Sequence, residues 1–242
     1  MKKIIKSSVL KALSIIFVLS VSFTVSNAQQ KKTTLINPDD AVFLFVDHQS
    51  GLVQTVHSMP VGELRKNLAT LAKASQLLHI PAIYTASVPT GPNGPTLPEV
   101  KDNAPNAKYV IRQGEINAWD SKEFVNAVKA TGRKTLIISG MWTSVCVVYP
   151  ALSALGEGYT VYAVADASGD ITPEAHNLAM LRLTQAGAIP VTCGAVLPEL
   201  MKDWRRKEAG DFAKLLADMV PNFQAVIEQY YKAQEVAKSE KQ

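Results

Sequence analysis

The chain has 242 residues, of which 47% are apolar and 19% are charged, with 13 glycines and 13 prolines. This is ordinary globular composition, and it excludes a disordered chain, a collagen-like repeat and a small disulfide scaffold. The formal net charge is +4, but residues 1–28 hold four lysines and no acid, so the rest of the chain carries 21 basic and 21 acidic side chains. A neutral body gives no electrostatic reason to expect a nucleic acid or an anionic membrane surface as partner.

The first 28 residues have the order of a secretory signal peptide. Lysines precede an apolar run from Ala12 to Val25, and the small residues Ser26-Asn27-Ala28 follow where a signal peptidase would cut. The apolar run is shorter than the roughly 20 residues that a helix needs to span a bilayer. We therefore predict that residues 1–28 are removed, that the mature domain is 29–242, and that the protein is secreted into the periplasm with no membrane partner after cleavage.

From Asp40 onward, short apolar runs rich in β-forming residues alternate with segments of helical spacing. Strands are predicted at 41–46, 82–85, 109–111, 135–139, 160–164 and 189–192. Helices are predicted at 61–78, around 124–128, at 145–155 and at 174–185, and the tail from Glu199 is helical in pieces broken near Gly210 and Pro221. This alternation predicts a single α/β domain with a parallel sheet and helices on both faces.

One long segment, Ser87 to Asn106, is rich in proline and glycine and interrupts the alternation. A loop of that length inside a compact domain is usually functional or makes contacts. We therefore predict a functional loop or a contact arm.

Reactive side chains follow several predicted strands, at the edge where parallel sheets bind ligands. Asp47 follows the first strand, Arg112 lies at the end of the third, and Cys146 follows the fourth at the start of a helix. A helix start carries partial positive charge and free N–H groups, which lower the pKa of a thiol and can hold an oxyanion. Asp47 could take the thiol proton, and Arg112 could hold the carboxylate. The pattern predicts a nucleophilic site, with the alternative that Cys146 is a small buried hydrophobe.

The other notable residues are predicted to be structural. Cys193 follows the last strand and has no comparable setting, so burial is expected. His48 follows Asp47 directly, and in an extended segment its side chain points the other way. Trp119 and Asp120 are predicted to cap the helix that starts near Lys122, and Asp166 to cap a turn or orient a loop.

No cofactor site has support in the sequence. His57, His79 and His176 are scattered and form no zinc-ligand spacing. No GxGxxG follows the first strand, and Gly91-Pro-Asn-Gly94 lacks the following Lys-Ser/Thr of a phosphate loop. We predict no cofactor and no metal.

Four segments, taken in order, resemble the isochorismatase-like cysteine hydrolases, in particular their YcaC-like branch. They are Phe45-Val-Asp47-His-Gln-Ser-Gly51, Thr90-Gly-Pro-Asn-Gly-Pro95, Arg112-Gln-Gly-Glu-Ile-Asn-Ala-Trp-Asp120 and Gly140-Met-Trp-Thr-Ser-Val-Cys146. The resemblance runs from about Asn37 to beyond Trp204. It implies a three-layer α/β/α sandwich with a six-stranded parallel sheet and a homo-oligomer, as a ring or paired rings.

The resemblance also implies a catalytic Asp-Lys-Cys triad and a non-proline cis peptide just before the nucleophile. The aspartate maps to Asp47 and the nucleophile to Cys146. The cis peptide would fall at Trp142-Thr143, turning the amides near Thr143 and Cys146 toward an oxyanion. The usual lysine position maps to Arg112, which can pair with Asp47 through two hydrogen bonds but cannot donate a proton.

The resemblance and the site together favour a hydrolase that cleaves an amide-like C–N bond of a small molecule through a Cys146 thioester. Asp47 would be the general base and Arg112 its electrostatic partner, and Trp142 and Trp119 would favour a partly apolar substrate. The Asp-x-His metal ligands of nicotinamidase relatives are absent, and dedicated isochorismatases lack the nucleophilic cysteine, so neither of those substrates is favoured. The alternative hypothesis is a family scaffold with little turnover that serves assembly or redox sensing.

Overall fold

A computed structural model describes residues 35–239 of the chain. The predicted signal peptide lies outside the described residues. In the part that is described, no helix is long and apolar enough to cross a membrane.

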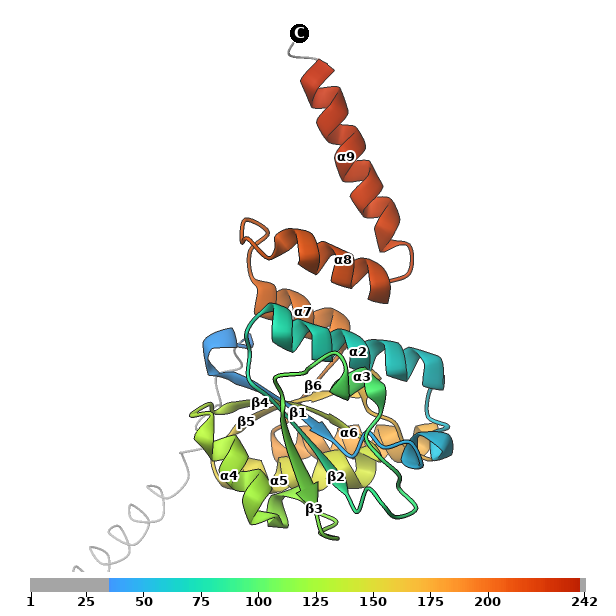
Figure 1. Cartoon of the computed structure of the whole chain (residues 1–242), viewed down its shortest axis with the longest axis vertical. Helices are drawn as coiled ribbons and strands as arrows, with labels where there is room; N and C mark the ends of the chain where they lie inside the picture. Colours follow the sequence, from blue (N-terminus) through green and yellow to red (C-terminus); the bar gives the residue numbers. More distant parts are fainter. Residues whose placement is uncertain (1–34, 240–242) are drawn as a thin grey trace, which may run out of the picture. The chain divides into compact units, whose positions relative to one another are not determined.

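The centre of the fold is a six-stranded parallel sheet in the order β3-β2-β1-β4-β5-β6 (Figure 1). Each predicted strand is confirmed to within two residues at either end, because runs buried on both faces of a sheet leave a strong apolar signal. The strands are β1 Ala41–Val46, β2 Ala82–Ser87, β3 Lys108–Arg112, β4 Thr135–Gly140, β5 Thr160–Val164 and β6 Ile189–Val191.

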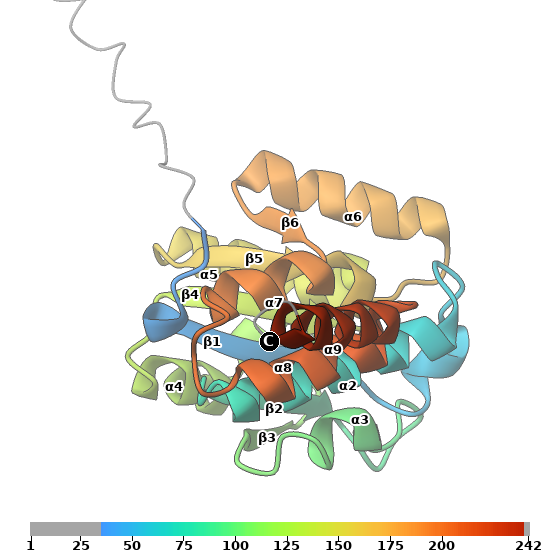
Figure 2. The same ribbon diagram turned by 90° about the horizontal axis from the view of Figure 1, so that it is seen from above.

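Helices cover both faces of the sheet, which confirms the predicted three-layer arrangement (Figure 2). One face packs against α2 Val61–Leu77, α7 Cys193–Met201 and α8 Ala209–Met219. The other packs against α4 Lys122–Ala130, α5 Val148–Gly156 and α6 Pro173–Ala186. β1 contributes side chains to the hydrophobic cores on both faces of the sheet, with Phe43 and Phe45 on the first face and Leu44 on the second.

Short helical turns complete the chain, together with a final helix, α9 Phe223–Ser239, in which no residue is buried. The turns are η1 Pro38–Asp40, η2 Leu52–Thr55, η3 Ala118–Asp120, η4 Thr143–Val147 and η5 Ala165–Ala167.

Two helix boundaries differ from the prediction. The helix expected from 145 to 155 is preceded by η4, a single π-helical turn that holds Cys146. α7 begins at Cys193 instead of Glu199, since Asp166 from a distant loop accepts the N–H of Cys193 at 2.8 Å. The predicted breaks in the tail near Gly210 and Pro221 are confirmed: α7 ends at Met201, α8 begins at Ala209, and α9 begins after Pro221.

The proline- and glycine-rich segment from Ser87 to Asn106 is a packed arm of the body. It contains the short helix α3 Pro98–Lys101 and buries Leu97, Val100 and Ala104 in the core beside α2. The arm therefore contacts its own chain.

Candidate active site

Asp47 lies directly after β1, where the chain leaves the middle of the sheet. Its φ of 55° is in the left-handed region, which aspartate tolerates better than most residues. Its N–H donates to the carbonyl of Thr85 at 2.9 Å, and its own carbonyl accepts the N–H of Gln49 at 2.8 Å. β1 lies between β2 and β4, where the strand order reverses, so this turn is at the switch point at which parallel sheets bind ligands.

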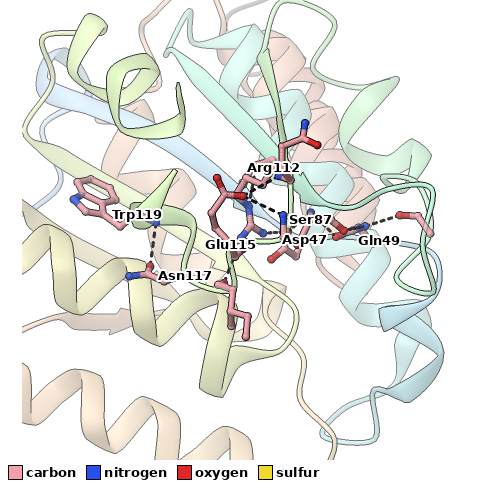
Figure 3. A network of polar contacts seen from close by, with 12 residues as sticks. Asp47, Gln49, Ser87, Arg112, Glu115, Asn117 and Trp119 are labelled. Atoms are coloured by element: carbon pink, nitrogen blue, oxygen red, sulfur yellow. Dashed lines mark hydrogen bonds and ion pairs between the residues drawn. The ribbon is translucent and has the colours of Figure 1, made fainter. Parts of the chain in front are cut away.

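Arg112 ends β3 and reaches across β2 to Asp47 (Figure 3). Its Nη2 donates to Asp47 Oδ1, and its Nε donates to Thr85 Oγ1 at 3.1 Å. Its Nη1 donates to the carbonyls of Glu115 and Ile116. The two side chains are 0% and 3% exposed. A buried ion pair of this kind persists only when the remaining donors have partners, and here they do.

Cys146 lies in η4, after the neighbouring strand β4, and its thiol is close enough to Asp47 and Arg112 to interact electrostatically with both side chains. The residue is 7% exposed. Burial raises the pKa of the Cys146 thiol well above its usual value, and the charge and hydrogen bond of Asp47 raise it further, while Arg112 acts in the opposite direction. The prediction that the helix start lowers this pKa is wrong, because burial and the facing anion outweigh the helix dipole. The resting thiol is protonated, with a base in contact.

The backbone around the thiol is held by the segment that follows β5. Thr143 N–H donates to the Gly169 carbonyl at 2.8 Å, and Ser144 N–H donates to Asp170 Oδ2 at 2.7 Å. Asp170 is fully buried, and its other oxygen accepts the N–H of Ile171. The turn that presents the thiol is thus fixed from outside its own helix.

His176 of α6 adds a side-chain contact to the same turn. Its Nδ1 lies 2.9 Å from Thr143 Oγ1. Burial lowers the pKa of His176, and the charge of Asp170 partly offsets this. At neutral pH the ring is therefore a neutral hydrogen-bond partner for the Thr143 hydroxyl.

Comparison with known proteins is consistent with this arrangement. The model of the isochorismatase domain matches residues 41–194, which contain the whole sheet and the three residues of the site. The chain belongs to the isochorismatase family.

Within this family the chain is close to YcaC proteins. It is 43% identical over 195 residues to the Escherichia coli (strain K12) protein named "Probable hydrolase YcaC", an alignment that covers 81% of this chain and 93% of that protein. This places the chain in the YcaC-like branch, as an isochorismatase-family hydrolase.

Two solved structures match the fold closely. YcaC from Pseudomonas aeruginosa, solved with hexane-2,5-diol and covalent acrylamide, has a TM-score of 0.79 and 43% identity, and covers 82% of this chain and 98% of its own. The Escherichia coli YcaC structure, described as an octameric hydrolase of unknown specificity, has a TM-score of 0.80 and 42% identity, and covers 84% of this chain and 99% of its own.

The cis peptide of this isochorismatase-family chain is one residue earlier than predicted. It joins Met141 to Trp142, and not Trp142 to Thr143. The helical turn already begins at Thr143, whose N–H is taken by Gly169, so the prediction that the Thr143 amide points toward an oxyanion is wrong. Cys146 N–H donates to the Trp142 carbonyl at 2.7 Å.

Cys193 is buried, as predicted, and His48 is buried as well. Cys193 is fully buried, and burial, followed by the charge of Asp166, raises the pKa of its thiol. His48 is 1% exposed, its Nε2 lies 3.0 Å from Ser139 Oγ, and burial lowers its pKa to about 3. Asp166 caps α7 through the Cys193 N–H, as a capping role predicts.

Trp119 and Asp120 do not have the predicted roles. The side chain of Ser121 caps α4 instead, accepting the N–H of Phe124. Trp119 packs edge-on against Phe124 and Tyr159 in the core and points away from the Asp47–Arg112 pair (Figure 3). It is therefore part of the core and does not line the site.

Two other kinds of ligand site were compared with this one: a cluster of metal-binding side chains and a surface cavity. Within residues 35–239, no three His, Cys, Asp or Glu side chains are placed to hold a metal ion. A surface cavity of about 530 Å³ lies between β3 and α4, lined by residues that include Tyr109, Ile111 and Glu123. None of Asp47, Arg112 and Cys146 lines that cavity, so the chemistry of the side chains locates the site better than cavity size does.

Two polar residues that hold the site were missed from the sequence, Gln49 and Asp170. Gln49 lies in the Phe45–Gly51 segment, which is one of the four segments that carry the family resemblance. Its position in that segment was the sequence signal that could have indicated a role at the site. Asp170 follows the Asp166–Gly169 segment, but nothing in the local sequence indicates that it meets Ser144.

Proposed function

We propose that the protein hydrolyses an amide-like C–N bond of a small molecule, with Cys146 as nucleophile. One observation carries the proposal: a nearly buried thiol lies beside a carboxylate that is itself ion-paired with a buried arginine. A protonated thiol in contact with a base can be activated at the moment of attack.

The reaction needs one proton acceptor, and Asp47 supplies it. As the sulfur attacks the carbonyl carbon, an S–C bond forms and the thiol proton moves to Asp47. Asp47 returns this proton to the nitrogen as the C–N bond breaks, leaving a thioester and a free amine. Water then attacks the thioester, its proton passes by way of Asp47 to the departing sulfur, and a carboxylic acid and the original thiol result.

Arg112 acts through charge and hydrogen bonds. It stays protonated throughout, so it orients Asp47 and stabilises the negative charge shared by the carboxylate and the sulfur.

The Pseudomonas aeruginosa relative supports this assignment, since its structure holds covalent acrylamide. Acrylamide is an electrophile that thiols attack, and it carries a carboxamide. We extend that reactivity to this chain and assign it to Cys146. The scaffold or redox-sensing alternative has no observation of its own in its favour.

We also propose that the chain forms a homo-oligomer, on the example of the octameric Escherichia coli relative, and that it is exported to the periplasm, on the evidence of its first 28 residues. Sedimentation of the mature chain and N-terminal sequencing of the secreted protein test these two points. A monomer at micromolar concentration would contradict the first proposal, and a chain that stays in the cytoplasm with Met1 intact would contradict the second.

The test of the function is a panel of small primary and secondary amides, with ammonia or amine release as the readout. At least one amide should be hydrolysed by the wild type, and Cys146→Ala should lower kcat by about 10³-fold or more. Cys193→Ala is the matched control and should retain activity. Hydrolysis that survives in Cys146→Ala would contradict the proposal.

A further inference from the structure

The side chain of Gln49 is fully buried, yet each of its polar atoms has a partner. Its Oε1 accepts the N–H of Ser87 at 3.1 Å, and its Nε2 donates to the carbonyls of Ser87, at 3.1 Å, and Gly94 (Figure 3). The amide thus pairs with both backbone groups of Ser87, as a neighbouring strand would. An apolar or charged residue could not make the same set of bonds.

The N–H of Ser87 is shared between Gln49 and Asp47. It donates to Asp47 Oδ1 at 3.1 Å as well as to Gln49 Oε1. Asp47 Oδ1 therefore has two donors, Arg112 and Ser87. No hydrogen bond from a nitrogen donor to Oδ2 is found among residues 35–239, so in the proposed mechanism Oδ2 is the oxygen that takes the thiol proton. A shift of Ser87 would turn the carboxylate and move that oxygen.

Gln49 also anchors the arm that follows Ser87. Its backbone pairs with Thr96 in an antiparallel bridge, and Ser50 N–H donates to the Pro95 carbonyl at 2.9 Å. The arm lies so close that a Cβ on Gly51 would be 2.1 Å from the Pro92 carbonyl oxygen. The arm and the general base are therefore joined through one buried amide.

We propose that Gln49 is a positioning residue for Asp47, holding Ser87 and the arm so that one carboxylate oxygen faces the Cys146 thiol. The inference rests on the proposed function, because it gives Asp47 its role as base. Gln49 acts through Asp47 and contacts neither the thiol nor the substrate. Its neutrality matters as much as its shape, since a carboxylate at this position would lose both donors and add a second anion beside Asp47.

The test measures the rate at which acrylamide adds to Cys146 as a function of pH, by mass spectrometry of the Cys146 peptide. Gln49→Glu keeps the shape and adds a charge, and Gln49→Met removes the hydrogen bonds without adding one. Gln54→Glu and Gln54→Met are matched controls, because Gln54 is exposed and its side-chain amide donates to the Ser50 carbonyl, with no other partner found among residues 35–239. The charged groups facing the thiol are Asp47 and Arg112, with Asp170 and His176 on the other side of the turn.

Gln49→Glu should move the midpoint of the pH profile upward by about half a unit or more, and slow the addition at pH 7 by about threefold or more. Gln49→Met should slow it at pH 7 by about threefold as well, with a smaller change of midpoint. Both Gln54 variants should match the wild type. Thermal unfolding of each variant shows which of them are folded.

A folded Gln49→Glu with the wild-type midpoint would overturn the proposal, as would a folded Gln49→Met with the wild-type rate. If Gln49→Glu does not fold, Gln49→Met decides. The outcome separates this inference from the proposed function: a wild type in which Cys146 reacts no faster than Cys193 counts against the nucleophile itself, whereas a reactive wild type with unresponsive Gln49 variants counts only against the role of Gln49.

Discussion

The two cysteines of the described chain occupy similar local positions but different surroundings. Each lies near the start of a helix that follows a parallel strand, and the charge of a nearby aspartate raises the pKa of each thiol. The Asp47 carboxylate is ion-paired with Arg112. The Asp166 carboxylate instead accepts the backbone N–H of Cys193, and no ion pair to it is found among residues 35–239.

A helix start and a neighbouring carboxylate are common to both thiols, so neither feature singles out Cys146 as the proposed nucleophile. Burial raises the pKa of both thiols, so the helix dipole distinguishes neither. Two features separate them: a cation that compensates the base, and exposure of 7% against 0%. The base beside Cys146 is free to accept a proton, whereas the one beside Cys193 has a capping role.

The largest effect is expected from exchanging the Asp47 carboxylate for an amide. Asp47→Asn should lower kcat for any amide that the wild type hydrolyses by about 10²–10⁴-fold, because the proton acceptor is gone. Since the charge of Asp47 raises the pKa of the Cys146 thiol, the same variant should ionise this thiol at lower pH. Steady-state kinetics and the pH dependence of Cys146 alkylation provide the readouts.

Asp166→Asn is the control for that exchange, since it changes the carboxylate beside the other cysteine. It should keep wild-type kcat. A similar loss of turnover in both variants would erase the distinction between the two sites.

The next largest effect is expected from removing the positive charge of Arg112. Arg112→Met leaves the buried Asp47 carboxylate without its partner, which should lower the free energy of unfolding by about 3–5 kcal/mol. Arg112→Lys restores the charge but cannot reproduce the bonds to Thr85 and to the carbonyls of Glu115 and Ile116 together, so an intermediate loss is expected. Urea unfolding measures both, and equal stability of Arg112→Met and the wild type would show that the ion pair does not hold Asp47.

Alkaline pH should reveal what the two thiols have in common. A thiol whose pKa is raised by folding stays protonated in the native state, whereas in the unfolded state it ionises above its ordinary pKa of 9.0. Stability is therefore lost as the pH rises above that value, by about 1.4 kcal/mol per pH unit for each thiol.

Cys193→Ala and Cys146→Ala should each flatten this alkaline decline by one thiol's share relative to the wild type, measured by urea unfolding between pH 8 and 10.5. A slope unchanged by either substitution would mean that the folded and unfolded thiols ionise alike.

The sheet was predictable because its signal is local. Runs such as Ala41–Val46 are apolar at every position, and only a strand buried on both faces requires this. Asp47, Arg112 and Cys146 could be placed from the same reasoning, because the carboxyl ends of parallel strands share one edge.

What the sequence did not predict depends on contacts between distant segments. Gln49 meets Ser87 across 38 residues, and Asp170 meets Ser144 across 26. The direction of the Cys146 pKa shift was missed for a related reason: the helix start is visible in the sequence, whereas burial and the distance to Asp47 are properties of the folded chain. The start of α7 was missed because its cap comes from Asp166.

The central claim is that Cys146 is the chemically competent thiol of this chain. Brief exposure of the native wild-type protein to acrylamide at pH 7, followed by peptide mass spectrometry, measures both cysteines in one sample. We predict addition to Cys146 about tenfold faster or more than to Cys193. Equal rates, or faster addition to Cys193, would contradict the account.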